Sequence, residues 1–259
     1  MRCLLRNKHA VDNHVGLGCE IVSIANKAQN ALISHFDPKS PVVEAFRTLR
    51  TNLQYIKAGE SLRKLLITSP GPGEGKSTIV ANLGYLLAQS GKKVIVVSAD
   101  LRKPTVHKIL QMPNRQGLTN ILAGMASLDE CLMPVPLIEN LHFIASGPTP
   151  PNPAELLGSG QMSELINELE RRADIVVFDA PPVVAVTDAA VMAPKMDGTV
   201  LVINMGAVPR ELAVRSKAQL EAVGARVVGA ILNRVDVKAG YGYYYYYYYA
   251  HKDDPGTAV

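Results

Sequence analysis

The chain has 259 residues, of which 47% are hydrophobic and 19% are charged. This length and apolar content suffice for one substantial core, so we expect one main domain with appendages. The formal net charge of +4, without a long Lys/Arg run, gives no reason to expect nucleic acid as a partner. The scattered cysteines lack metal-ligand spacing, which favours a reducing, cytoplasmic setting, and no apolar run reaches the roughly 20 residues of a membrane-spanning helix.

Strand and helix patterns alternate along most of the chain. Residues 1–37 are weakly patterned and are expected to be irregular, and a helix pattern follows within 38–58. Short runs rich in Val, Ile and Leu then predict strands buried on both faces, at 65–69, 94–100, 141–146, 175–181, 199–204 and 227–233. Helix patterns lie at 76–89, 161–172 and 209–223. The order predicts an α/β fold, doubly wound, with a mostly parallel sheet and helices on both faces. We assign this domain to residues 38–237.

A glycine-rich loop follows the first of these predicted strands. Residues 69–78 read SPGPGEGKST and lead directly into a helix pattern. Glycines let backbone N–H groups surround phosphate oxygens, and the helix N-terminus adds its positive dipole end. Lys76 is expected to reach the β- and γ-phosphates of ATP, and the Ser77 hydroxyl to bind Mg²⁺. Pro70 stands where the strict pattern has glycine, but the cradle depends mostly on the later glycines.

Two aspartates stand at the ends of predicted strands. Asp100 ends the run VIVVSAD, and Asp179 ends the run IVVFD. The carboxyl ends of parallel strands converge on one crevice in a doubly wound sheet, so both carboxylates are expected to face the phosphates and the metal ion. Three nearby residues stay open: Arg102 and Lys103 contact phosphate, a neighbouring subunit or only solvent, and Asp188 either caps a helix or lines the site.

The C-terminal segment, residues 238–259, carries most of the tyrosines of the chain and is called the tyrosine tail below. Eight of the ten tyrosines occur there, namely Tyr241, Tyr243, Tyr244, Tyr245, Tyr246, Tyr247, Tyr248 and Tyr249. A run of adjacent tyrosines has neither the period of a helix face nor the alternation of a strand, so it has no core role. Its phenols could be phosphorylated, stack on bases or sugars, or promote aggregation.

Taken together, these motifs resemble those of the bacterial tyrosine kinases (BY-kinases) of capsule and exopolysaccharide production. GEGKST, SADLRKP and DAPPV resemble the Walker A, A′ and B motifs of that family, EAFRTLRTN at 44–52 resembles its E-x-x-R-x-x-R motif, and the tyrosine tail resembles its phosphorylated cluster. The resemblance implies that Lys76, Asp100 and Asp179 are catalytic and that Ser77, Asp100 and Asp179 hold Mg²⁺. It also implies an ATP site made by Gly73, Glu74, Gly75, Lys76, Ser77, Thr78 and Asn233, with Asn233 at the adenine edge.

The same resemblance implies an assembly and partners. Glu44, Arg47 and Arg50 would make head-to-tail contacts that close a ring, in which each tyrosine tail is phosphorylated by a neighbour. A transmembrane activator, a polysaccharide co-polymerase chain, would hold the kinase at the inner face of the plasma membrane. A reversible cycle would also require a cognate tyrosine phosphatase.

One position departs from the family pattern, and it keeps other functions open. The Walker A′ motif of the family commonly has two aspartates, and Ser98 stands at the first of these positions. One alternative is therefore a catalytically weak adaptor that binds nucleotide. The other is an ATPase switch of the MinD/ParA type, although those relatives usually have a lysine where this chain has Gly71.

Overall fold

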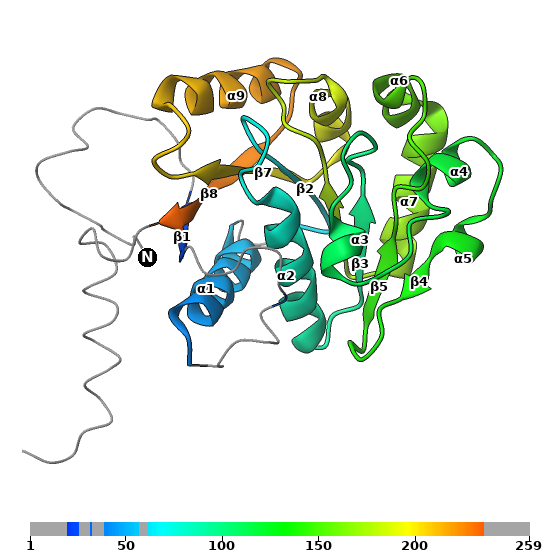
Figure 1. Cartoon of the computed structure of the whole chain (residues 1–259), viewed down its shortest axis with the longest axis horizontal. Helices are drawn as coiled ribbons and strands as arrows, with labels where there is room; N and C mark the ends of the chain where they lie inside the picture. Colours follow the sequence, from blue (N-terminus) through cyan, green and yellow to red (C-terminus); the bar gives the residue numbers. More distant parts are fainter. Residues whose placement is uncertain (1–19, 26–31, 33–38, 57–61, 236–259) are drawn as a thin grey trace, which may run out of the picture.

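The computed structural model describes residues 20–25, 32, 39–56 and 62–235 (Figure 1). The tyrosine tail lies outside the described residues, as does most of the N-terminal segment. None of the helices in the described ranges combines the length and apolar character needed to cross a membrane.

An eight-stranded sheet forms the centre of the fold, in the order β1-β8-β7-β2-β6-β3-β5-β4. All neighbouring strands are parallel except β4 and β5. The predicted α/β, mostly parallel architecture is therefore confirmed. In chain order the strands are β1 (Glu20–Ala25), β2 (Lys64–Thr68), β3 (Val94–Ser98), β4 (Met133–Pro134), β5 (Leu141–Ile144), β6 (Ile175–Asp179), β7 (Gly198–Asn204) and β8 (Val227–Val235).

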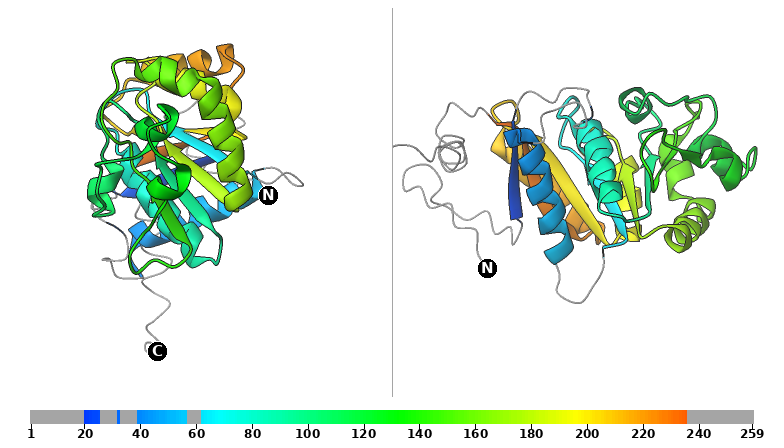
Figure 2. Two further views of the ribbon diagram at one scale, coloured as in Figure 1. Left: turned by 90° about the vertical axis from the view of Figure 1, so that its right-hand side faces the viewer. Right: turned by 90° about the horizontal axis from the view of Figure 1, so that it is seen from below.

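Helices cover both faces of this sheet (Figure 2). Side chains alternate across each strand, so Leu65 and Ile67 of β2 enter one core while Leu66 enters the other. The first core is covered by α1 (Pro41–Tyr55), α2 (Lys76–Gln89) and α3 (Val106–Ile109). The second is covered by α4 (Leu118–Leu122), α5 (Leu128–Cys131), α6 (Pro153–Gly158), α7 (Gly160–Arg172), α8 (Asp188–Met192) with the 3₁₀ turn η2 (Ala193–Lys195), and α9 (Arg210–Ala222).

The six predicted strands and the helices at 76–89, 161–172 and 209–223 are all present, with ends that differ by at most two residues. The predicted helix at 38–58 is shorter than expected. It begins at Pro41, because the Ser40 side chain accepts a hydrogen bond from the Val43 N–H at 3.3 Å and proline fits the first helical position. It ends at Tyr55.

The expectation that residues 1–37 are irregular is wrong for residues 20–25. These form β1, which pairs in parallel with β8 at the edge of the sheet. The sequence EIVSIA is short, and its partner strand comes about two hundred residues later, so no local pattern indicates the pairing. Helix α1 lies beside β1 and α2, which places it over this edge (Figure 1).

Candidate active site

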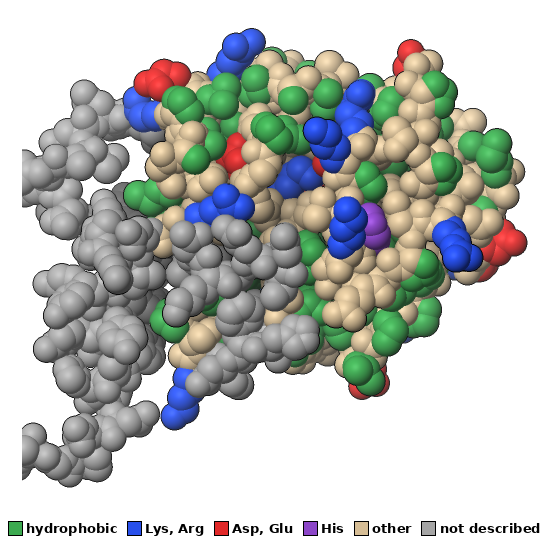
Figure 3. Space-filling view, viewed as in Figure 1, with side chains coloured by type: hydrophobic (Ala, Val, Ile, Leu, Met, Phe, Trp, Pro, Cys, Tyr) green, Lys and Arg blue, Asp and Glu red, His purple; other side chains and the backbone are tan. Residues whose placement is uncertain are grey.

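A pocket of about 460 Å³ lies where the carboxyl ends of β2, β3 and β6 meet. Figure 3 shows the hollow in the face of the molecule, with Lys and Arg side chains around it. Its walls come from four places along the sheet and one helix on its face. They are the loop and first turn of α2 at 72–79, residues from 100 to 105, residues from 181 to 186, Asn233 with Arg234, and Phe46 of α1.

The glycine-rich loop has the shape of a phosphate cradle. Gly73 and Gly75 adopt left-handed backbone angles, with φ of 76° and 91°. A side chain at Gly75 would meet the Asn233 Nδ2 atom at 2.2 Å, so the position requires glycine for space as well as for conformation. Asn233 fixes the loop from β8, because its Nδ2 donates to the Glu74 carbonyl oxygen at 2.8 Å.

The Glu74 side chain also stabilises this loop, and it is buried. Its carboxylate accepts hydrogen bonds from the N–H groups of Gly71 and Asn204, the latter at 3.0 Å. Burial raises the pKa of Glu74, against the lowering effect of these two hydrogen bonds. The carboxylate therefore joins the loop to the end of β7, and the first turn of α2, whose backbone N–H groups lack intrahelical partners, lines the pocket.

The predicted catalytic residues converge around one ammonium group. Lys76 Nζ lies 2.8 Å from Asp100 Oδ2 and 3.2 Å from Asp179 Oδ1, and the Ser77 hydroxyl donates to Asp179 Oδ2 at 2.7 Å. All four side chains are buried. Asp100 and Asp179 extend from β3 and β6, which are neighbours in the sheet, as their positions at strand ends predicted.

Burial and ion pairing set the charge states of this cluster. Burial by itself lowers the pKa of Lys76, but the attraction of Asp179 and Asp100 outweighs it, so that the pKa lies above its ordinary value. Burial raises the pKa of Asp179, and this effect exceeds the opposing influence of Lys76 and Ser77. The Lys76 ammonium group thus neutralises two carboxylates that a bound metal ion could also neutralise.

The oxygen atoms of this cluster fit Mg²⁺. A hydroxyl and two carboxylates within reach of a phosphate loop are the hard ligands that this ion takes, usually with one or two carboxylates and substrate phosphates. No cluster of three or more His, Cys, Asp or Glu side chains occurs in the described part of the chain, so a site made only of protein ligands is not formed there. Ser77, Asp179 and Asp100 would hold the ion.

Two residues left open by the sequence form an ion pair at one wall of the pocket. Arg102 Nε and Nη2 donate to the two carboxylate oxygens of Asp188 at 2.9 and 3.0 Å. Asp100 also orders this loop, because its Oδ1 accepts from the N–H of Lys103 at 2.9 Å. Ser98, at the departure from the family pattern, is fully buried, and its Oγ has no hydrogen-bond partner among the described residues.

The other predicted site residues divide between the pocket and the exposed side of α1. Those that line the pocket, besides the cluster at Lys76, are Gly73, Glu74, Gly75, Thr78 and Asn233. Glu44 and Arg47 instead form an exposed pair on α1, with Arg47 Nη1 3.1 Å from Glu44 Oε2. Arg50 lies on the same helix and is partly buried. The predicted phosphoacceptor tyrosines, 241 and 243–249, lie outside the described residues.

Sequence reasoning missed several residues of the pocket wall. Phe46 reads as a core residue of an amphipathic helix, and it is fully buried, yet it also lines the pocket. Arg234 follows Asn233 and adopts a left-handed φ of 58°. Val186 belongs to a loop without a motif. Only the adjacency of Arg234 to a predicted site residue could have indicated any of them.

Comparison with known proteins agrees with this geometry. A family model described as an AAA domain matches residues 64–207, which is more than half of the chain. The tyrosine-protein kinase YwqD of Bacillus subtilis is 41% identical over 220 residues, covering 84% of this chain and 92% of that protein. The putative tyrosine-protein kinase CapB of Staphylococcus aureus is 38% identical over 82% of this chain and 92% of its own length.

Solved structures extend the likeness to three dimensions. A chimeric protein named CapA2B2 superposes with a TM-score of 0.79 at 38% identity, covering 85% of this chain and 96% of that one. The septum site-determining protein MinD from Pyrococcus horikoshii, solved with Mg-ADP, gives a TM-score of 0.58 at 25% identity over 66% of this chain and 70% of its own. The fold is thus common to both groups, and the higher identity lies with the kinases. With a phosphate loop and two strand-end carboxylates already in place around Lys76, this similarity shows that the chain belongs to the bacterial tyrosine-protein kinases of capsule and exopolysaccharide biosynthesis.

Proposed function

We propose that this tyrosine kinase phosphorylates its own tyrosine tail, in trans, within a closed ring of identical subunits. The observation that carries the proposal that the tail is the substrate is the place where the tail begins, and transfer in trans rests on the ring described below. Strand β8 brings Asn233 into the pocket and ends at Val235, six residues before Tyr241. At about 3.3–3.6 Å per extended residue, those six residues span roughly 20 Å, so the first acceptor tyrosine can reach the mouth of an active site nearby.

The geometry supports a direct transfer from ATP to tyrosine. The cradle and Lys76 would hold the phosphates, and Ser77, Asp179 and Asp100 would hold Mg²⁺, which when bound would neutralise charge on the β- and γ-phosphates. The tyrosine phenol oxygen bonds to the γ-phosphorus while the bond from that phosphorus to the ADP oxygen breaks, and ADP leaves with the electron pair. The Asp100 carboxylate accepts the phenol proton. Asp100 thereby takes over the role of the first aspartate of the family motif, whose place Ser98 occupies.

The charged edge of α1 supports the proposed ring. Glu44 and Arg47 are exposed and pair only with each other in the described part of the chain, so they are accessible to a second copy. A contact between two different surfaces of identical subunits gives a closed ring when its rotation closes. Such a ring would place each tyrosine tail beside a neighbour's pocket.

Phosphorylation would then change the charge of each subunit enough to open the ring. Each phosphotyrosine adds about −1.5 to −2 charges at neutral pH, so three phosphates bring the formal charge of +4 to about zero or below. Crowded tails of like charge repel one another. The ring would alternate between closed and open states, and this cycle would control when the polymer is synthesised or exported. A tyrosine phosphatase would return the tail to its unphosphorylated form.

The kinase would act at the inner face of the plasma membrane through a transmembrane activator, a polysaccharide co-polymerase chain. A related chain solved as a chimera named CapA2B2 supports pairing with a second component. The MinD-like fold keeps an ATPase switch as the second candidate.

One assay separates these functions. The full chain, with the cytoplasmic tail of its activator, is incubated with labelled ATP and Mg²⁺ and probed for phosphotyrosine, with Lys76→Met as the inactive control. We expect the active chain to phosphorylate the tail of the Lys76→Met chain when the two are mixed. An unmodified Lys76→Met chain would refute transfer in trans. ATP hydrolysis without phosphotyrosine would indicate the switch, and nucleotide binding alone would indicate an adaptor.

A further inference from the structure

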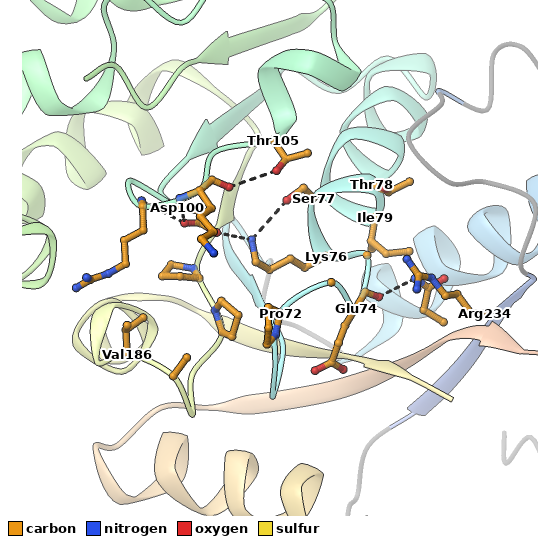
Figure 4. Close-up of a pocket in the computed structure, with 18 of the residues that line it drawn as sticks. Pro72, Glu74, Lys76, Ser77, Thr78, Ile79, Asp100, Thr105, Val186 and Arg234 are labelled. Atoms are coloured by element: carbon orange, nitrogen blue, oxygen red, sulfur yellow. Dashed lines mark hydrogen bonds and ion pairs between the residues drawn. The ribbon is translucent and has the colours of Figure 1, made fainter. Parts of the chain in front are cut away.

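The pocket extends beyond the part that a phosphate loop accounts for. Glu74 and Arg234 lie at one end, Lys76 lies in the middle, and Asp100 and Val186 lie at the other end (Figure 4). The loop fixes the phosphates of a nucleotide near Lys76. Because the attacking and leaving oxygens of a phosphoryl transfer lie roughly in line, the acceptor must approach from the side opposite ADP. Asn233, next to Arg234, offers an amide to the adenine edge, so we assign that end to ADP and the end with Asp100 and Val186 to the acceptor.

The walls of the acceptor end combine an apolar surface with a cation. Pro182, Ala185 and Val186, from the loop between β6 and α8, provide apolar atoms, and Arg102 lines the pocket from the loop after β3. A tyrosine side chain has the matching chemistry, since an apolar ring carries a polar oxygen at its tip. A serine or threonine hydroxyl has no ring to contact this wall.

Arg102 is held in one orientation and still has donors to spare. Its bidentate pair with Asp188, at 2.9 and 3.0 Å, joins the loop after β3 to the start of α8, 86 residues later in the chain. Asp188 is fully buried, while the Arg102 side chain is 39% exposed. Two of the five N–H donors of a guanidinium are used in this pair, so about three remain for a ligand. The buried carboxylate thus fixes the plane of a guanidinium group that is partly exposed, on a residue that lines the pocket.

This inference rests on the proposed autokinase function and assigns its acceptor subsite. We propose that Arg102, oriented by Asp188, binds the oxygens of the phosphoryl group as it passes to a tyrosine whose ring lies against Pro182, Ala185 and Val186. The bond from the phenol oxygen to phosphorus forms as the bond from phosphorus to the ADP oxygen breaks, ADP keeps the electron pair, and Asp100 takes the phenol proton. Arg102 donates hydrogen bonds to the oxygens on which charge accumulates, and Asp188 is a positioning residue.

The test measures transfer to the acceptor separately from binding of the donor. The enzyme is the full chain with its tail tyrosines replaced by alanine, together with the activator's cytoplasmic tail, and the acceptor is the Lys76→Met chain with its tyrosine tail intact. The rate of tail phosphorylation is measured against acceptor concentration, and the ATP dissociation constant is measured by direct binding. The variants are Arg102→Ala, Arg102→Lys, Asp188→Asn and the double variant Arg102→Ala/Asp188→Asn. Lys108→Gln removes a nearby exposed charge on α3 that does not line the pocket and serves as the control.

We expect Arg102→Ala to lower kcat about 10²-fold, as removal of a donor to a developing oxyanion does, without changing the ATP dissociation constant. Arg102→Lys keeps the charge but cannot form the bidentate pair, so it restores only part of the rate. Asp188→Asn lowers kcat in the wild-type background and has no further effect beside Arg102→Ala, because it acts through that residue. Lys108→Gln behaves as the wild type.

Several outcomes would overturn the subsite. An unchanged kcat in Arg102→Ala would refute it, and an equal loss of ATP affinity would move Arg102 to the donor side. If Asp188→Asn costs as much in the Arg102→Ala background as alone, Asp188 is only structural. If the wild-type enzyme with its activator yields no phosphotyrosine on the acceptor chain, the proposed function itself fails, and the subsite assignment fails with it.

Discussion

Two buried carboxylates share one ammonium group at the end of the sheet, and this arrangement has consequences at the scale of single residues. Lys76 pairs with both Asp100 and Asp179. If a bound nucleotide draws the ammonium group toward its phosphates, the two carboxylates lose this positive charge, and a metal ion would supply it instead. We therefore expect binding of ATP and binding of Mg²⁺ to be linked through this cluster.

The affinity for Mg-ATP is expected to depend on pH through Asp179. Burial raises the pKa of this carboxyl above its ordinary value of 3.8, and a metal ion binds only the deprotonated form. Affinity is therefore full above the raised pKa and falls as the pH is lowered through it. Titration of the dissociation constant against pH tests this, with Asp179→Asn as the control that retains the titration of ATP itself. Parallel curves for the two proteins would contradict the expectation.

Ser98 gives a second prediction at the same scale. Its buried Oγ lacks a partner among the described residues, and burying an unbonded hydroxyl costs roughly 1–3 kcal/mol. We expect Ser98→Ala to raise the free energy of unfolding by about 1 kcal/mol and to leave tail phosphorylation intact, as measured by urea denaturation and phosphotyrosine assay.

A matched control is Thr68→Val, because the Thr68 hydroxyl is also buried but donates to the Pro181 carbonyl oxygen at 2.7 Å. This substitution should destabilise the protein by about 1–3 kcal/mol. If Ser98→Ala abolished phosphorylation while the fold persisted, Ser98 would have a catalytic role that its burial does not suggest.

At the scale of elements, α1 has two faces with different tasks. Phe46 is fully buried and lines the pocket, whereas Glu44 and Arg47 pair at 42–44% side-chain exposure. We expect Phe46→Ala to lower the free energy of unfolding by about 3–5 kcal/mol, as for other large buried side chains. The double variant Glu44→Ala/Arg47→Ala should change it by less than about 1 kcal/mol, because exposed ion pairs contribute little.

The same double variant should change the assembly state. Native mass measurement is expected to show monomers for Glu44→Ala/Arg47→Ala where the wild type shows a closed oligomer. A wild-type-sized assembly in the double variant would remove α1 from the interface, and a large loss of stability would mean that the pair supports the fold instead.

The sequence predicted the elements whose signals are local. The loop at 69–78 and the strands ending in Asp100 and Asp179 carry motifs whose chemistry depends on adjacent residues, and each lies where it was expected. The pair between Arg102 and Asp188 could not be derived, because 86 residues separate its members and neither carries a period or spacing that names the other. Similarly, β1 is recognisable only through its pairing with β8.

At the scale of the whole molecule, the charge of the tyrosine tail is expected to control assembly. The formal net charge of +4 becomes negative once more than about two or three phosphates are added per subunit, at −1.5 to −2 each. Native mass spectra recorded before and after autophosphorylation should show that the assembly dissociates. Added salt should reduce this dissociation, because it screens the repulsion between the phosphorylated tails. An assembly that keeps its mass with several phosphates per chain would refute this form of regulation.

The pairing of β1 with β8 also bears on how the protein is made. These strands lie at opposite ends of the chain, yet they close one edge of the sheet, the edge over which α1 lies. A ribosome releases the N-terminal strand long before its partner exists, and contacts between distant segments form slowly. The sheet edge beside α1 is therefore completed only when residues 227–235 have emerged. If α1 forms the proposed ring contact, nascent kinases cannot complete this edge, or assemble through it, before synthesis of the domain is finished.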